Sequence, residues 1–108
     1  PDPIPWWGGK GPSDKSITTN DILSFTDVIP RMPDFAFQIR PIVKGFTITI
    51  SKNGVVSSKV STNNKITSAQ EALLRKARPG TRIFIEDSKV RMPDKTTRIL
   101  NMSLLVTR

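Results

Sequence analysis

The chain contains neither cysteine nor histidine among its 108 residues. Without cysteine it has no thiolate nucleophile and no disulfide, and without either residue type it cannot build a Cys/His zinc site. It also lacks the side chain that most readily transfers protons near neutral pH. The missing cysteine does not assign a compartment, because domains without disulfides occur both in the cytosol and in oxidising cell envelopes.

Long apolar runs are also missing. No run approaches the roughly 20 apolar residues that cross a bilayer as a helix, and no basic segment followed by an apolar one opens the chain. We therefore expect any membrane anchor or export signal to lie outside this sequence. The length fits one domain that buries a single core.

Acidic residues are few: nine aspartates and glutamates against 17 lysines and arginines leave a formal charge of +8. Such a charge is typical of domains that bind nucleic acid, an anionic surface or an acidic protein. The densest group of cations follows the predicted helix. At such a helix end, cations on a solvated face interact favourably with the helix dipole. That group, which is our candidate for partner binding, consists of Arg75, Lys76, Arg78 and Arg82.

The first 13 residues differ in composition from the rest, with four prolines, three glycines and the adjacent Trp6 and Trp7. Proline and glycine at this density predict a linker or N-terminal segment over residues 1–13, followed by a single domain over residues 14–108. Exposed indoles are costly and favour a groove or a partner. The two tryptophans are therefore either packed back onto this domain or candidates for contact with another chain.

Alternating apolar and polar residues predict several β-strands. The clearest alternation lies in residues 35–39. Asn53-Gly54 is a dipeptide of tight hairpin turns, so strand 43–51 is expected to pair with strand 55–61. The remaining expectations are a short strand or cap at 16–18, an edge strand or bend at 27–32, and strands at 81–92 and 97–107 joined by a turn at 93–95.

One helix is predicted clearly over residues 69–77, because either Thr67 or Ser68 can open a capping box before it. A short second helix is predicted within residues 18–25. The expected fold class is mainly β, a β-sandwich-like arrangement of antiparallel strands with these helices, and α+β is the alternative.

The sequence predicts no catalytic site, no metal site and no cofactor. Glu86 and Asp87 are adjacent, but neighbours on a strand point to opposite faces and do not converge on one ion or substrate. The serines have no histidine to serve as base. Gly8-Gly9-Lys10-Gly11 lacks the preceding strand and following helix of a phosphate loop.

The alternative function is a basic nucleic-acid-binding β-barrel module, in which exposed aromatic side chains stack on bases. Phe46, Phe84 and the phenylalanines of residues 35–39 fall at positions expected in the core. Only Trp6 and Trp7 then remain to stack, so nucleic acid is not the expected partner.

The most specific stretch is Arg-Pro-Gly-Thr-Arg-Ile-Phe-Ile-Glu-Asp at residues 78–87, followed by Pro93-Asp94 and Arg98-Ile99-Leu100. Compatible stretches are Gly8-Gly9-Lys10-Gly11, Val43-Lys44-Gly45-Phe46-Thr47-Ile48 and Asn63-Asn64-Lys65-Ile66-Thr67. Together these residues resemble the C-terminal domain of the GldM/PorM family, the periplasmic shaft proteins of the Bacteroidetes gliding-motility and type IX secretion machinery.

This resemblance implies a function that no residue indicates alone. Proteins of the family are anchored in the inner membrane and couple a proton-driven motor to a ring associated with the outer membrane. The resemblance therefore implies a periplasmic, non-catalytic domain that forms a homodimer and binds ring proteins of the GldK/PorK and GldN/PorN type. The motor partner, of the GldL/PorL type, would bind regions outside this chain.

Overall fold

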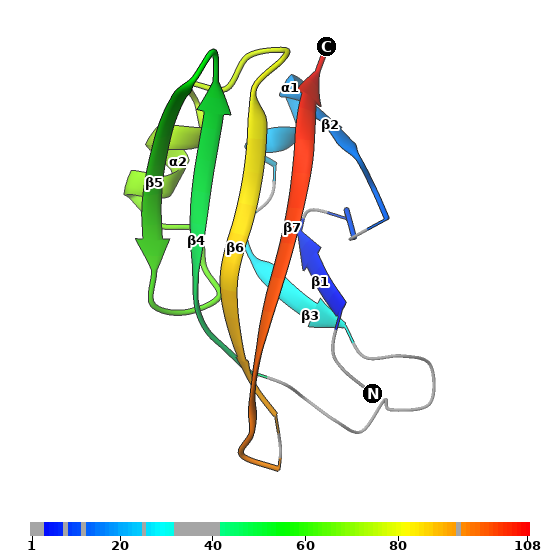
Figure 1. Ribbon diagram of the computed structural model, residues 1–108, viewed down its shortest axis with the longest axis vertical. Helices are drawn as coiled ribbons and strands as arrows, with labels where there is room; N and C mark the ends of the chain where they lie inside the picture. Colours follow the sequence, from blue (N-terminus) through cyan, green and yellow to red (C-terminus); the bar gives the residue numbers. More distant parts are fainter. Residues whose placement is uncertain (1–3, 8, 12, 25, 32–41, 93) are drawn as a thin grey trace.

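The computed structural model describes residues 4–7, 9–11, 13–24, 26–31, 42–92 and 94–108. The molecule measures 41 × 24 × 22 Å, and a twisted five-stranded sheet runs along its length (Figure 1). A two-stranded sheet and two helices lie behind this large sheet in the same view. The other face of the large sheet, which we call the outer face, is turned toward the viewer.

The large sheet has the strand order β2-β7-β6-β4-β5. All its neighbouring strands are antiparallel except β2 and β7, which run parallel. The expected antiparallel arrangement is therefore confirmed for the hairpins, while the short edge strand departs from it. The strands are β2 (Ser16–Thr18), β4 (Ile42–Lys52), β5 (Val55–Ser61), β6 (Arg82–Arg91) and β7 (Thr97–Thr107).

The turn between β4 and β5 is formed by Asn53 and Gly54, both of which have positive φ, at 52° and 80°. Lys52 and Val55 face each other across it. Asparagine and glycine tolerate this backbone better than other residues, which is why the dipeptide predicted the hairpin correctly.

The small sheet pairs β1 (Ile4–Trp7) antiparallel with β3 (Val28–Arg31). The strand expected within residues 27–32 is thereby confirmed. Residues 4–7 fall inside the segment that we interpreted as a linker or N-terminal segment, and their pairing makes them part of the fold. The strand predicted at 35–39 lies outside the described residues.

Both predicted helices are present, as α1 (Thr19–Ile22) and α2 (Ser68–Leu74). Thr67 and Gln70 form the expected capping box: the Gln70 N–H donates to Thr67 Oγ1 and the Thr67 N–H to Gln70 Oε1, both at 3.0 Å. The α2 helix ends three residues before the predicted end at 77. The chain continues beyond α2 as a tighter turn of the 3₁₀ type, because the N–H groups of residues 76 and 77 donate to carbonyls three residues back.

The core lies behind the large sheet. On β6 the buried side chains are Ile83 and Ile85, and after a register shift they become Ser88 and Val90. Asp87, at the irregularity, has a φ of 51°, as expected for the extra residue of a β-bulge. The bulge therefore changes which residues of β6 face inward. Other buried apolar side chains are Trp7, Ile17, Ile22, Val28, Phe46, Ile48, Leu73, Leu74, Met102, Leu104 and Val106.

Candidate interaction surfaces

The basic residues predicted to bind a partner lie near the end of the molecule where the chain passes from α2 into β6, at the top of Figure 1. All of them are exposed. We call them the upper basic group, which consists of Arg75, Lys76, Arg78 and Arg82.

Part of the upper basic group stabilises the end of α2. Arg75 Nη2 pairs with Glu71 Oε1 at 2.5 Å, and Arg78 Nη1 donates to the carbonyl oxygens of Arg75 and Ala77 at 3.0 and 3.1 Å. Carbonyls at a helix end lack partners within the helix, and a guanidinium satisfies them. Arg75 and Arg78 therefore have a local structural role, as the interpretation of a dipole-complementing helix end proposed.

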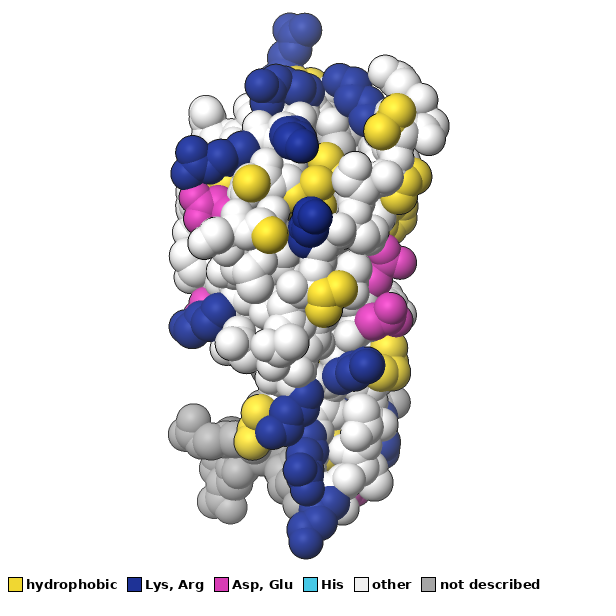
Figure 2. Space-filling model, turned by 90° about the vertical axis from the view of Figure 1, so that its left-hand side faces the viewer, with side chains coloured by type: hydrophobic (Ala, Val, Ile, Leu, Met, Phe, Trp, Pro, Cys, Tyr) yellow, Lys and Arg dark blue, Asp and Glu magenta, His cyan; other side chains and the backbone are white. Residues whose placement is uncertain are grey.

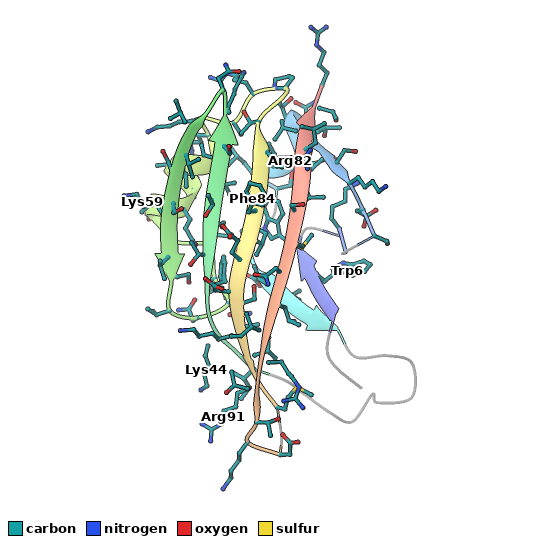
Figure 3. The ribbon with its side chains drawn as sticks, viewed as in Figure 1. Trp6, Lys44, Lys59, Arg82, Phe84 and Arg91 are labelled. Carbon is teal, nitrogen blue, oxygen red and sulfur yellow. The ribbon has the colours of Figure 1, made fainter. Side chains whose placement is uncertain are left out.

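Arg82 lies on the outer face of the sheet, away from the side that α2 covers, and Figure 3 labels it beside Phe84. It lines a depression of about 780 Å³ that includes side chains of both charges. The structure thus divides the upper basic group between two faces of the sheet. The depression is lined by Asp14, Lys15, Arg82, Phe84, Glu86, Asn101, Met102, Ser103 and Leu105.

The positions of the two described phenylalanines of the large sheet differ from each other. Phe46 is buried as expected, but Phe84 is only partly buried and lines the outer depression. Its neighbours Ile83 and Ile85 point into the core, and alternation along a strand then turns Phe84 outward. The expectation that Phe84 is a core residue is therefore wrong.

The end of the β6–β7 hairpin carries a second basic surface, which our sequence analysis did not single out. The register places Lys89 opposite Gly45 and Ile99, and Arg91 opposite Ile42 and Thr97. Figure 2 shows basic side chains gathered at this lower end, and Figure 3 labels two of them. This lower basic group consists of Lys44, Lys89, Arg91, Lys95 and Arg98.

Asp94 introduces a negative charge into the turn of this hairpin. Its Oδ1 accepts hydrogen bonds from Thr96 Oγ1 at 2.6 Å and from the Thr96 N–H at 3.0 Å. The side-chain hydrogen bond, followed by the backbone one, lowers the pKa of Asp94, and the positive charge of Arg98 adds to this effect. The carboxylate therefore remains charged to lower pH than an ordinary aspartate.

The two tryptophans occupy different environments. Trp7 is 0% exposed and belongs to the core, which removes it from the candidates for partner contact and for stacking on a nucleic acid. The physical reason is the pairing of β1 with β3, which turns this indole inward. Trp6 is partly exposed, and its ring lies so close to Gly11 that a Cβ there would be 2.5 Å from Trp6 Cζ3.

The described residues contain neither a cluster of metal ligands nor a helix suited to a membrane span. No group of three or more acidic, histidine or cysteine side chains there could hold a metal ion. In the same part of the chain, no helix has the length and apolar character that a membrane span requires.

The sequence matches a model of a known protein family. A family model described as the GldM C-terminal domain matches residues 1–107. A search of curated proteins found no match. The family match covers nearly the entire chain and confirms the resemblance that the motifs indicated.

Proposed function

The chain belongs to the GldM C-terminal domain family, and on that premise we propose that it is the end domain of a periplasmic shaft that couples an inner-membrane, proton-driven motor to an outer-membrane-associated ring. Membership of the family associates the chain with gliding motility and type IX secretion, as a structural component. The coupling role, the periplasmic location and the anchor and export signal outside this chain are parts of the proposal.

The proposed partners are ring proteins of the GldK/PorK and GldN/PorN type and a second copy of this chain. A motor partner of the GldL/PorL type would bind elsewhere in the longer protein. The formal charge of +8, with groups of basic side chains toward both ends of the face in Figure 2, supports an acidic docking surface on the ring. Complementary charge speeds association and suppresses wrong partners, which suits an interaction domain without chemistry of its own.

Within the upper basic group, Lys76 and Arg82 are the best residues for testing this docking. Arg75 and Arg78 make contacts at the end of α2, so their substitution would also disturb the helix. A matched pair at the opposite end is Lys44 and Arg91, which are also exposed.

The experiment titrates the chain against the purified ring complex. We expect the K76E/R82E variant to bind about tenfold more weakly than the unchanged chain, because two interface charges contribute together about 1.4 kcal/mol. The K44E/R91E variant carries the same change of net charge and is expected to bind nearly as well as the unchanged chain. Equal losses in both variants would contradict docking through the upper end, and no binding by the unchanged chain would refute the proposed function.

A further inference from the structure

The β5 strand forms one edge of the large sheet, and among the described residues it pairs only with β4. Six of its seven residues are exposed. Val55, Val56 and Val60 are 69%, 62% and 64% exposed, which is unusual for apolar side chains on a strand. Figure 2 is viewed from this edge, and its middle shows apolar and uncharged side chains with an isolated basic side chain among them, while larger groups of Lys and Arg side chains lie toward the two ends. Lys59 is the basic residue of β5 itself.

The hairpin register determines which backbone groups of β5 point away from the sheet. The two-residue turn makes Lys52 and Val55 a hydrogen-bonded pair, and such pairs alternate along an antiparallel ladder. The backbone groups of Val56, Ser58 and Val60 therefore point toward the free edge. An edge of this kind can accept a further strand.

The sequence of β5 is complementary to itself. An antiparallel copy centred on Ser58 places Val56 opposite Val60 and Lys59 opposite Ser57. Shifting the centre to Lys59 would instead place two ammonium groups directly opposite each other, which is destabilising. Shifting it to Ser57 would place Val56 opposite Ser58 and lose the apolar pairs. One register therefore both pairs the valines and separates the lysines.

We propose that β5 is a self-association edge, through which two copies of this chain pair antiparallel and join their large sheets. This inference deepens the homodimer of the proposed function by naming its surface. A second copy fits although each chain carries +8, because the centred register keeps the two Lys59 ammonium groups from facing each other. The upper and lower basic groups lie toward the ends of the 41 Å molecule, and exposed charges are screened beyond about 10 Å.

The pairing is expected to be weak between separate chains. One strand pair buries less than the roughly 1,200 Å² typical of stable interfaces. Copies held together elsewhere in a longer protein would have a local concentration of about millimolar, which makes a weak contact effective. The paired state must therefore be trapped by a covalent cross-link or measured at a high concentration of the chain.

Single cysteines test the register, because the chain has no cysteine of its own. In the centred register two Ser58 Cα atoms would lie about 5.5 Å apart, within disulfide reach. Two Ser57 residues would be displaced by about 7 Å along the strand in addition to the separation across it, which is beyond reach. With oxidised glutathione, S58C is expected to form covalent dimers at least about tenfold faster than S57C. Equal rates would overturn the register.

Charge variants at Val56 and Val60 test the same contact without cross-linking. V56K/V60K places like charges opposite each other and is expected to remain monomeric by sedimentation at about millimolar concentration. V56E/V60K places opposite charges across the same pairs and is expected to dimerise. Association of V56K/V60K equal to that of the unchanged chain would overturn the proposal. The ring-binding experiment uses substitutions outside β5, so the two proposals are tested independently. A chain that binds the ring but does not self-associate would contradict only the β5 proposal, and the reverse result would contradict only the proposed function.

Discussion

At the scale of single residues, Gly45 on β4 is governed by a close contact between backbone segments rather than by the regular ladder. A Cβ at Gly45 would lie 2.9 Å from the carbonyl oxygen of Ser61, closer than real Cβ atoms approach such an atom. The register of β4 against β6 is irregular on both sides of Gly45. The close approach of two backbone segments thus requires glycine here.

We expect Gly45→Ala to destabilise the fold by about 1–3 kcal/mol, because the atoms it meets belong to backbone that moves only with the strands. The measurement is urea unfolding followed by circular dichroism. Lys44→Ala at the exposed neighbouring position is the control and is expected to change the free energy of unfolding by less than about 0.5 kcal/mol. A midpoint unchanged by Gly45→Ala would show that the two segments separate easily.

Thr96→Val is expected to raise the pKa of Asp94 toward its ordinary value, because it removes the hydroxyl that donates at 2.6 Å. A carboxyl group with a lowered pKa stabilises the folded state above its unfolded pKa, and this contribution is lost as the pH falls through the folded pKa. The difference in stability between the two chains is therefore present at neutral pH and lost in acid, whereas the protonation of Asp94 differs between them only in acid. NMR titration of the Asp94 carboxyl measures it, and identical midpoints would contradict the role of the hydroxyl.

At the scale of elements, Gln70 connects α2 to the large sheet. Its side chain is buried, its Oε1 accepts from the Thr67 N–H, and its Nε2 donates to the carbonyl oxygen of Lys59 on β5 at 3.1 Å. One amide therefore both caps the helix and attaches it to the edge strand.

Gln70→Leu replaces the amide by an apolar group of similar size and leaves the Thr67 N–H and the Lys59 carbonyl without this partner. We expect a loss of about 1–3 kcal/mol in the free energy of unfolding. Thr67→Ala removes only the helix cap and is expected to cost about 0.5–2 kcal/mol. Ala72→Gln, at an exposed position of the same helix, is the control in thermal unfolding. Equal stability of Gln70→Leu and the control would refute this link between the elements.

Local signals were sufficient for several elements. The Asn53-Gly54 turn, the capping box and the alternation in residues 97–107 each depend on neighbours in sequence, and each was predicted correctly. Other features depend on distant residues. The parallel pairing of β2 with β7 and the turning of Trp7 into the core arise from contacts that no local pattern encodes.

The two basic groups also differ in whether neighbours in sequence or distant residues bring their members together. Arg75, Lys76 and Arg78 were noticed because they are close in sequence. The lower basic group was missed because its members come from three strands and the β6–β7 turn and gather only through the register of β4, β6 and β7. The bulge at Asp87 likewise changes the inward positions of β6, and the acidic pair that precedes Ser88 gives no local sign of it.

At the scale of the whole molecule, the N-terminal strand is expected to be necessary for stability. Removal of residues 1–7 deletes β1 and with it Trp7, which is 0% exposed in the core. We expect Trp7→Ala alone to cost about 3–5 kcal/mol, and the truncation to cost at least as much. Val55→Ala, at a position 69% exposed, is the control and is expected to be nearly neutral. Thermal unfolding compares the three, and a truncated chain as stable as the intact one would indicate a dispensable leader segment.

The parallel pairing of β2 with β7 has a mechanical consequence. Residues 16–18 run alongside residues 105–107 in the same direction. Opposed pulls on the start of β2 and on the end of β7 would therefore act along both strands and load their hydrogen bonds together, in shear. An antiparallel pair pulled from one end would instead open bond by bond. A domain that transmits tension through this pair resists rupture with several bonds at once, and its lifetime under load is set by the rate of unfolding rather than by equilibrium stability.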